Sequence, residues 1–212
     1  MPGLSQQKAR IFRITHVENV PWILSNGLYC RNSGRRDPHF REIGHPELIQ
    51  KRARRPVPLG PGGTLSDYIP FYFTPHSPML YNIKTGVGVP KLPMREIAIL
   101  VSTLALVRIA GVPFVFTDRH AYMAAAQFYN VLDDLSHIDW ALLNRRDFKR
   151  DANDLGKFER YQAEALVHSK LPVSALYAVA CYAAEQKGRL EMAAAATGAN
   201  IRVLVKPEWY FR

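Results

Sequence analysis

The chain has 212 residues, of which 48% are hydrophobic and 22% are charged. This length suits one domain, 1–212, and the composition provides a core and excludes the fibrous and intrinsically disordered classes. No apolar run reaches the about 18 residues that a membrane-spanning helix needs. The segment from Met1 to Lys8 also lacks the apolar core of a secretory signal. We therefore expect a cytoplasmic protein whose two cysteines are reduced. We also expect it to be a monomer.

Basic residues exceed acidic ones by 28 to 18, which gives a formal charge of +10 and favours nucleic acid or another polyanion as partner. Two segments hold arginine-rich groups. The first is Arg31, Arg35, Arg36, Arg41, Lys51, Arg52, Arg54 and Arg55. The second is Arg145, Arg146, Lys149, Arg150, Lys157 and Arg160, which nearby acidic residues dilute. The arginine guanidinium can bind a phosphate through two hydrogen bonds, so both groups suit a phosphate-bearing partner. An organism that favours arginine would explain the second group equally well.

In the first half of the chain, alternation predicts a strand over 10–15 and spacing predicts a helix over 17–25 that Asn26-Gly27 ends. An arginine-rich loop over 31–44 follows, and then a helix that opens at Pro46 and carries Arg52. Prolines and glycines over 56–63 indicate an irregular connection. A strand over 68–74 and a short helix from Ser77-Pro78 through Tyr81 come next.

In the second half, we expect a strand over 96–101, a helix capped by Ser102 or Thr103 and running through Ile109, and a strand over 113–116. A helix is expected over 119–129, and a long ordered loop with helical turns over 130–155. Strands over 162–167, 175–182 and 201–205 surround a helix over 185–197. Strands and helices do not alternate regularly, which favours an α+β fold.

The sequence offers no metal site, because it has no His-Glu-x-x-His and no histidine pair four residues apart. It also lacks the glycine-rich phosphate-binding motifs of nucleotide-binding folds. Three short strings are more informative. They are Ile-Thr-His-Val-Glu-Asn at 14–19, Tyr-Phe-Thr-Pro-His-Ser-Pro-Met-Leu-Tyr at 72–81, and Gln-Ala-Glu-Ala-Leu-Val at 162–167.

The third string places one carboxylate, Glu164, in an otherwise apolar strand. With a period of two, Gln162, Glu164 and Leu166 share one face of that strand. Burying an unpaired carboxylate is costly. Glu164 therefore faces solvent, which is the commoner outcome for such a residue, or belongs to a functional site.

Together the three strings resemble the ADP-ribosyltransferase superfamily, in its branch with the order His, Tyr, Glu. They are most similar to the DarT family of DNA ADP-ribosyltransferase toxins, and within it to the thymine-modifying branch. The similarity covers nearly the whole chain and is most specific over 71–81. It implies an ADP-ribosyltransferase fold with a central, split, largely antiparallel sheet and flanking helices.

The resemblance also implies roles for particular residues. The catalytic glutamate corresponds to Glu164, and the catalytic arginine best matches Arg55, with Arg52 and Arg54 as competitors. An arginine-rich element, 31–57, would bind NAD, and the segment 123–164 would be the substrate-reading loop. The implied NAD-binding residues are Thr15, His16, Glu18, Asn19, Gly27, Arg55, Tyr72, Ser77, Met79 and Tyr81. The implied DNA-binding residues are Trp140, Arg145, Arg146, Phe148, Lys149 and Arg150.

Elementary chemistry agrees with these roles. Cleaving the bond between nicotinamide and ribose develops positive charge on the ribose, which a carboxylate stabilises. The same carboxylate could accept the proton of a thymine ring nitrogen as a general base. The reacting base must be unpaired, which favours single-stranded DNA. NAD+ would be consumed as a co-substrate, so neither a bound cofactor nor a metal is expected.

Two other functions remain open at this point. The same fold could act on RNA ends or on protein side chains, as RNA 2′-phosphotransferases and protein-directed transferases do. The +10 charge would also suit a nucleic-acid-binding module without catalytic activity. The resemblance favours the DNA-modifying enzyme, with single-stranded DNA, NAD+ and a DarG-type macrodomain antitoxin as partners.

Overall fold

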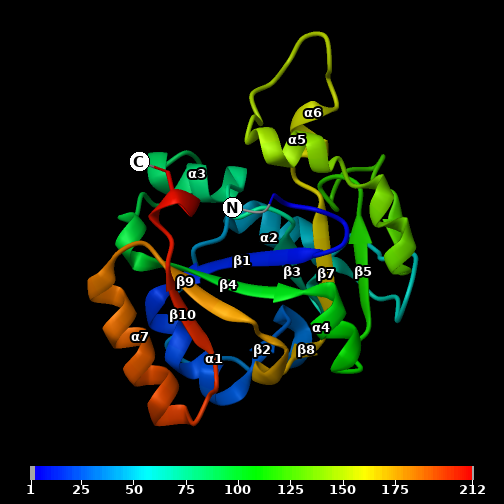
Figure 1. Ribbon diagram of the computed structural model, residues 1–212. Helices are drawn as coiled ribbons and strands as arrows, with labels where there is room; N and C mark the ends of the chain where they lie inside the picture. The colour runs from blue at the N-terminus through cyan, green and yellow to red at the C-terminus, as the bar shows by residue number, and fades with distance from the viewer. Residues whose placement is uncertain (1–2, 212) are drawn as a thin grey trace.

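An eight-stranded sheet runs through residues 3–211, the part of the chain that this computed structural model describes (Figure 1). Residues 1, 2 and 212 of the expected domain lie outside the described residues. The order across the sheet is β10-β9-β4-β1-β3-β7-β5-β6, and every neighbouring pair is antiparallel except β10 with β9. The strands are β1 (Arg10–His16), β3 (Tyr68–Tyr72), β4 (Ile97–Thr103), β5 (Phe114–Thr117), β6 (Phe128–Tyr129), β7 (Glu164–His168), β9 (Ala178–Cys181) and β10 (Arg202–Val205). A separate pair joins β2 (Leu28–Tyr29) to β8 (Lys170–Leu171).

The sheet is split between β1 and β3. β1 pairs with β4 along its whole length, from Arg10 to His16, and β3 pairs with β7 along its whole length. Between β1 and β3, however, the register consists of one residue pair, Phe12 with Tyr72. The predicted α+β fold with a split, largely antiparallel sheet is confirmed, and the split leaves room for a site between the halves.

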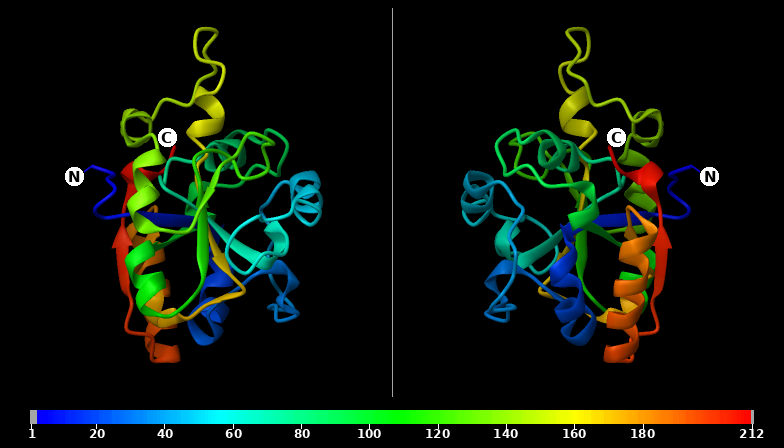
Figure 2. Two further views of the ribbon diagram at one scale, coloured as in Figure 1. Left: turned by 90° about the vertical axis from the view of Figure 1, so that its right-hand side faces the viewer. Right: turned by 90° about the vertical axis from the view of Figure 1, so that its left-hand side faces the viewer.

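Helices cover both faces of this sheet. On one face lie α1 (Val20–Asn26), α4 (Leu104–Ile109), α5 (Trp140–Arg145) and α7 (Ala184–Thr197), which share one hydrophobic cluster with the sheet. On the other face α3 (Pro78–Thr85) packs with Trp209 and Tyr210 near the C-terminus, which are 7% and 4% exposed. The aromatic residues near the C-terminus thus close the core on this face of the sheet. α2 (Pro46–Arg52) lies in the arginine-rich segment, on the side away from α4 and α7 (Figure 2).

Side-chain caps explain where several helices begin. The Ser77 hydroxyl accepts the Leu80 N–H at 3.2 Å at the start of α3, and the Thr103 hydroxyl accepts the Leu106 N–H at 3.1 Å at the start of α4. Both caps were predicted from the sequence, Thr103 as one of two candidates. α6 (Lys157–Arg160) is short, and the segment 147–156 before it projects from the body of the molecule (Figure 2).

The expected helix over 119–129 is wrong. Those residues form turns and then β6, because Asp118 closes a hairpin between β5 and β6. Its carboxylate accepts the Gln127 N–H at 3.0 Å, and its own N–H donates to the Gln127 carbonyl at 3.4 Å. The residues between Asp118 and Gln127 therefore form a loop rather than a helix, and this loop reaches over the end of β7.

Candidate active site

Glu164 is the first residue of β7, and it lies in a row with Tyr72 and Phe12. Tyr72 is the register partner of Glu164 on one side and of Phe12 on the other. Directly opposed residues of antiparallel strands project to the same face. The three side chains therefore line one face of the sheet at the point where its halves meet.

Glu164 is buried, with 2% of its surface exposed. Of the two outcomes that the sequence leaves open, the structure has the one in which this carboxylate belongs to a site. Arg52, the last residue of α2, donates to Glu164 Oε2 at 2.9 Å, and the two side chains are 12% and 3% exposed. A buried carboxylate is costly unless an opposite charge pairs with it, and the buried Arg52 guanidinium supplies that charge.

The turn after β5 completes the surroundings of Glu164. The Ala121 N–H donates to Glu164 Oε1 at 3.1 Å, and His120 Nδ1 lies 3.7 Å from the same oxygen. Burial raises the pKa of Glu164, but the charge of Arg52 and the hydrogen bonds from Arg52 and the Ala121 N–H outweigh it and leave the pKa below its usual range. Glu164 is therefore an anion at neutral pH.

His120 is neutral at the same pH. Burial lowers its pKa and Arg52 lowers it further, and Glu164 offsets this only in part. The Tyr122 N–H donates to His120 Nδ1 at 3.2 Å, so the ring proton belongs on Nε2. His120 thus presents a neutral N–H donor next to the buried anion. Nothing in the sequence distinguished it, because its partner follows 44 residues later in the chain.

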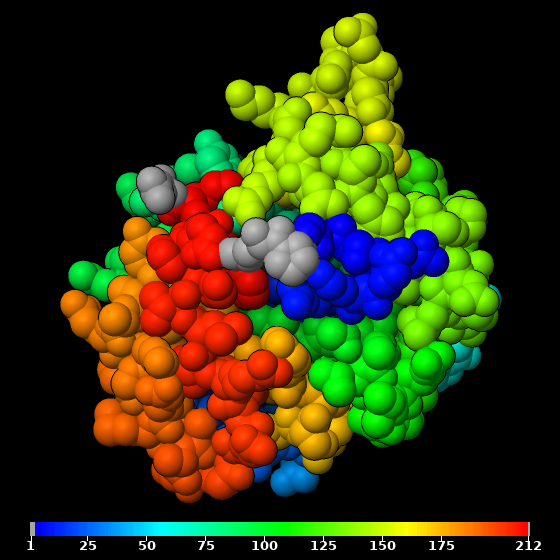
Figure 3. Space-filling model, in the orientation of Figure 1, coloured from blue at the N-terminus to red at the C-terminus, as the bar shows by residue number. Residues whose placement is uncertain are grey.

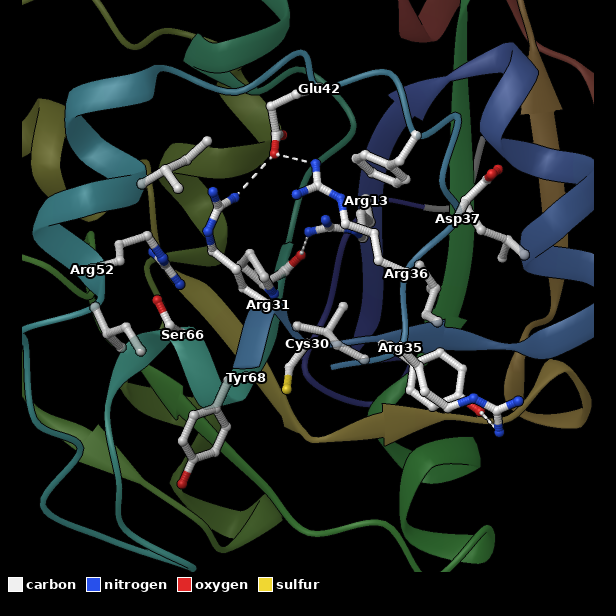
Figure 4. Close-up of a pocket in the computed structure, with 18 of the residues that line it drawn as sticks. Arg13, Cys30, Arg31, Arg35, Arg36, Asp37, Glu42, Arg52, Ser66 and Tyr68 are labelled. Atoms are coloured by element: carbon white, nitrogen blue, oxygen red, sulfur yellow. Dashed lines mark hydrogen bonds and ion pairs between the residues drawn. The ribbon is translucent and has the colours of Figure 1, made fainter. Parts of the chain in front are cut away.

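A cavity of about 160 Å³ opens where β1 and β3 diverge (Figure 4). Arg13 of β1 and Arg52 both line it, and Arg13 Nη1 donates to the Pro70 carbonyl at 2.9 Å across the split. Within residues 3–211, Arg13 Nε and Arg52 Nη2 are buried without a hydrogen-bond partner. Two buried cationic donors that face one cavity indicate a binding site for an anion.

The rest of the cavity wall comes from the arginine-rich element. Arg31, Arg35 and Arg36 lie along it, and Glu42 accepts from Arg31 at 3.2 Å and from Arg36 at 3.3 Å, as the dashed lines in Figure 4 show. Aromatic rings complete the wall. They are Trp22, Tyr29, Phe40 and Tyr68. The cavity therefore combines ring-binding surface with an arginine rim.

The sequence favoured Arg55 as the catalytic arginine, but the structure places Arg52 beside Glu164. α2 ends at Arg52, and the turn that follows it carries Arg54 and Arg55 away from the carboxylate. Arg55 instead donates to the Met123 carbonyl at 3.0 Å and lines a separate open hollow next to Tyr122. Arg52, Arg54 and Arg55 lie within four positions and have the same local sequence surroundings. Only the position of the helix end distinguishes the arginine that reaches Glu164 from the other two.

The predicted NAD-binding residues at the end of β1 form a local network. Asn19 Nδ2 donates to Thr15 Oγ1 at 3.0 Å, and Asn19 Oδ1 accepts the Arg41 N–H at 2.8 Å. Glu18 forms an ion pair with Arg41 at 2.5 Å. His16 accepts the Glu18 N–H and lines a different cavity, where its Nε2 lies 3.5 Å from Glu96. The structure does not bring His16 together with Glu164, and it is Arg13, which the sequence reasoning missed, that lies in the cavity with Arg52.

The remaining predicted NAD-binding residues lie in several different parts of the fold. Gly27 has φ +88°, and a Cβ there would lie 2.7 Å from the Leu171 carbonyl oxygen. Ser77 caps α3, and Met79 packs against the cluster that contains Trp209. Tyr72 lies beside Glu164, and burial together with that carboxylate raises the pKa of its hydroxyl. Tyr81 is 43% exposed, away from the Arg13–Arg52 cavity.

The predicted DNA-binding residues fall into two groups. Trp140 belongs to the core, because its Nε1 donates to the Leu135 carbonyl at 2.8 Å and its ring packs on Phe73. Phe148 packs against Tyr81 and Tyr161 with ring centroids 5.7 and 5.2 Å apart. The basic members Arg145, Arg146, Lys149 and Arg150 are exposed.

Residues 3–211 contain no cluster of three or more histidine, cysteine, aspartate or glutamate side chains that could hold a metal ion. Over the same residues, no helix combines the length and apolar character needed to cross a membrane.

The fold, with its largely antiparallel sheet and flanking helices, is that of ADP-ribosyltransferase structures. Residues 12–211 match the family model described as "ssDNA thymidine ADP-ribosyltransferase, DarT", and the chain belongs to this family. The RNA-directed, protein-directed and non-catalytic alternatives are therefore set aside.

Individual proteins agree with this assignment. A DNA ADP-ribosyl transferase of Escherichia coli O127:H6 is 51% identical over 99% of this chain and 96% of its own. The structure of Thermus sp. 2.9 DarT in complex with ADP-ribosylated ssDNA matches with a TM-score of 0.89, 32% identity and 97% coverage of both chains. The same Thermus protein in complex with NAD+ matches with a TM-score of 0.85, over 97% of this chain and 98% of that one. A Thermosipho africanus protein named as a fusion of DNA ADP-ribosyl transferase and DNA ADP-ribosyl glycohydrolase is 24% identical over 95% of this chain and 49% of its own.

Proposed function

We propose that this enzyme transfers ADP-ribose from NAD+ to a thymine base of single-stranded DNA, with Glu164 and Arg52 as the pair at the reacting centre. The observation that carries the proposal is the set of buried donors on Arg13 and Arg52 that face one cavity without partners among residues 3–211. Such donors are costly to bury unless an anion binds there. A dinucleotide with a pyrophosphate supplies that anion next to the carboxylate that its chemistry needs.

The cavity suits NAD+ in both shape and charge. Its volume of about 160 Å³ accommodates one aromatic ring of the dinucleotide among Trp22, Tyr29 and Tyr68. The arginine rim then follows the pyrophosphate, and Arg31 and Arg36 exchange Glu42 for phosphate oxygens. The predicted arginine-rich element 31–57 keeps its role in this proposal, but Arg13 and Arg52 replace His16 and Arg55 as its central residues.

The chemistry follows from the charge of Glu164. As the bond between the ribose carbon and the nicotinamide nitrogen breaks, the bonding electrons leave with nicotinamide and the ribose becomes cationic. Glu164, an anion 2.9 Å from Arg52, stabilises that cation in a site from which water is largely excluded. Arg52 keeps the carboxylate ionised and fixes its orientation.

The thymine nitrogen then forms the new bond to the ribose carbon and loses its proton. The lowered pKa makes Glu164 a weak base. However, the nitrogen becomes strongly acidic as the new bond forms, so a weak base suffices. The products are ADP-ribosylated thymine, nicotinamide and a proton.

We also propose that the DNA follows the exposed basic residues Arg145, Arg146 and Lys149 and the segment 123–164. Their charge attracts phosphates without reading sequence. The fusion of a DNA ADP-ribosyl transferase to a DNA ADP-ribosyl glycohydrolase in Thermosipho africanus supports a toxin that is paired with a macrodomain antitoxin able to remove the modification. We propose the same pairing here, with the enzyme acting as a monomer.

The test is the mass of an oligonucleotide incubated with the enzyme and NAD+. We expect a gain of one ADP-ribose on a single-stranded oligonucleotide that contains thymine, and none on its duplex or on a version without thymine. Arg13→Gln should raise the KM for NAD+ without changing the KM for DNA. A mass gain on the thymine-free oligonucleotide, or an unchanged KM for NAD+ in Arg13→Gln, would overturn the corresponding part of the proposal.

A further inference from the structure

A second cavity, of about 410 Å³, lies on the same face of the sheet as Glu164 and is separate from the Arg13–Arg52 cavity. Arg10, Phe12, Thr74, His76, Arg146 and Trp209 are among the residues that line it. It forms where four distant parts of the chain meet: the segment 74–76 that follows β3, and three others, which are the N-terminal segment with β1, the end of α5 with Arg146, and the C-terminal segment. Figure 3 shows these three segments side by side on one face, in blue, yellow-green and red.

The position of this cavity relative to Glu164 follows from the strand register. Phe12 lines the cavity, and Phe12, Tyr72 and Glu164 form one row across three neighbouring strands. Neighbouring strands lie about 4.8 Å apart, so the cavity floor at Phe12 is about 10 Å from the Glu164 backbone. A strand of DNA whose thymine reaches Glu164 can place a neighbouring nucleotide over Phe12.

The two arginines that line this cavity have no carboxylate partners within the described residues. Within residues 3–211 the Arg10 side chain makes no hydrogen bond or ion pair, and Arg146 donates only to the Glu208 carbonyl, at 3.4 Å. In the neighbouring loop two basic residues are neutralised by carboxylates, whereas Arg145 and Lys149 form no ion pair in the described part of the chain but do not line the cavity. Lys157 pairs with Asp147 at 2.5 Å, and Arg160 pairs with Asp154 at 2.7 Å. Two guanidinium groups without carboxylate partners therefore face one cavity.

The backbone at Arg146 holds this side chain in place at some cost. Arg146 has φ +55°, a left-handed conformation that glycine usually occupies at the end of a helix. The wall beside it is fixed, because Asn144 accepts the Leu4 N–H and donates to the Leu4 carbonyl, both at 2.8 Å. An arginine in a glycine position, on a wall that is otherwise rigid, indicates a function for its side chain.

The cavity also offers surfaces for a base. Burial, with Arg146 nearby, lowers the pKa of His76 to about 4, so its ring is neutral at physiological pH. The His76 ring packs on Phe211, and Phe211 packs on the exposed Tyr81, with centroids 5.6 and 5.3 Å apart. Aromatic rings thus continue from the cavity to the surface, next to the two arginines. This combination of aromatic and cationic groups is the one that binds single-stranded nucleic acid.

We propose that this cavity binds one nucleotide next to the target thymine, with Arg10 and Arg146 holding its phosphate and the His76 side of the cavity contacting its base. The inference rests on the proposed function, because it assigns a further subsite to the same DNA strand. It also reassigns Tyr81 from the NAD+ site to the rim of the DNA site.

The experiment compares enzyme variants on oligonucleotides of different length. The variants are Arg10→Gln, Arg146→Gly and their combination. Glycine suits the left-handed backbone, so Arg146→Gly should leave the thermal unfolding temperature unchanged or higher. Arg108→Gln is the matched control, because it removes one positive charge from an exposed residue of α4 that does not line the cavity. Each protein is assayed for kcat/KM at fixed salt on an oligonucleotide with nucleotides on both sides of one thymine. The assay is repeated on versions trimmed one nucleotide at a time from either end.

We expect each single variant to lose about tenfold in kcat/KM on the full oligonucleotide and the double variant about a hundredfold, since each charged hydrogen bond is worth at least about tenfold. On oligonucleotides trimmed past the bound nucleotide, the double variant and the wild type should react equally. The KM for NAD+ should not change. An equal loss on every length, or an equal loss in Arg108→Gln, overturns the subsite. If the wild type modifies no oligonucleotide, the proposed function itself fails, which is a different result.

Discussion

Arg52→Ala isolates the contribution of the ion pair at the centre of the site. Removing one partner of a buried pair typically destabilises a protein by about 3–5 kcal/mol, because the other charge is left uncompensated. Glu164 is 3% exposed, but it keeps the Ala121 N–H at 3.1 Å and His120 at 3.7 Å. We therefore expect the lower end, about 3 kcal/mol at pH 7. In a chain of this size, that is a fall of about 6–12 °C in Tm.

Arg55→Ala is the control for this variant. Arg55 loses one hydrogen bond to the Met123 carbonyl at an exposed position, which should cost no more than about 1 kcal/mol. Chemical denaturation at pH 7 measures both variants, and oligonucleotide mass measures transfer, which should fall at least about 100-fold in Arg52→Ala alone. The double variant Arg52→Ala/Glu164→Gln carries no orphaned charge, so it should recover most of the lost stability and remain inactive. Equal stability of the two single variants, or a greater loss of transfer in Arg55→Ala, would refute this reasoning.

Three further predictions concern single side chains. Glu164→Gln removes the charge and keeps an acceptor for only one of the two donors, Arg52 or the Ala121 N–H, because its NH2 group faces the other. Transfer should therefore fall about 100-fold or more, and the unfolding free energy should fall by about 1–3 kcal/mol; wild-type turnover in the mass assay would contradict this. Arg146→Gly relieves a left-handed arginine at φ +55°, so the unfolding free energy should stay constant or rise by up to about 1 kcal/mol, and a clear loss in denaturation experiments would count against the cap geometry. The pKa of His76 is about 4 in the folded protein and about 6.5 when unfolded, so the unfolded state takes up a proton first as pH falls, and stability should drop by up to about 3 kcal/mol between pH 6.5 and pH 4. Unfolding measured at pH 7 and pH 4.5 should show a smaller drop in His76→Asn, and an equal drop in both proteins would exclude His76 as the cause.

Local signals in the sequence were sufficient for most of the fold. Alternation gave β1 and β7 within two residues, and the serine and threonine caps located the starts of α3 and α4. The segment 119–129 failed because its apolar and alanine-rich composition suits a helix, whereas Asp118 closes a hairpin through a residue nine positions later. Tertiary pairing of this kind overrides local propensity.

The candidate site was predictable at Glu164 and much less so around it. The carboxylate stood out because it interrupts an apolar strand, where it must either face solvent or belong to a site, and the resemblance favoured the site. Its partner Arg52 is 112 positions away, among arginines of equal local character, so only the fold distinguishes it from Arg55. His16 and Arg13 lie on the same strand, and the sequence could not reveal that β1 separates from β3 on the side where Arg13 projects. The direction in which a sheet opens depends on contacts between distant residues.

The division of the sheet also determines when the enzyme becomes active during its own synthesis. β1 finds its partner β4 once residue 103 has been made, but β3 needs β7, which ends at residue 168. Domains are synthesised from the N-terminus, and strands that must wait for a distant partner stay unpaired until it emerges. The β1–β4 pair, which carries Arg13, can therefore form early, whereas Glu164 joins it only when about four-fifths of the chain exists, and β9 and β10 follow later still. A polypeptide that is released before that point would contain the arginine-rich element without the carboxylate. We expect such incomplete chains to be harmless to the cell that makes them.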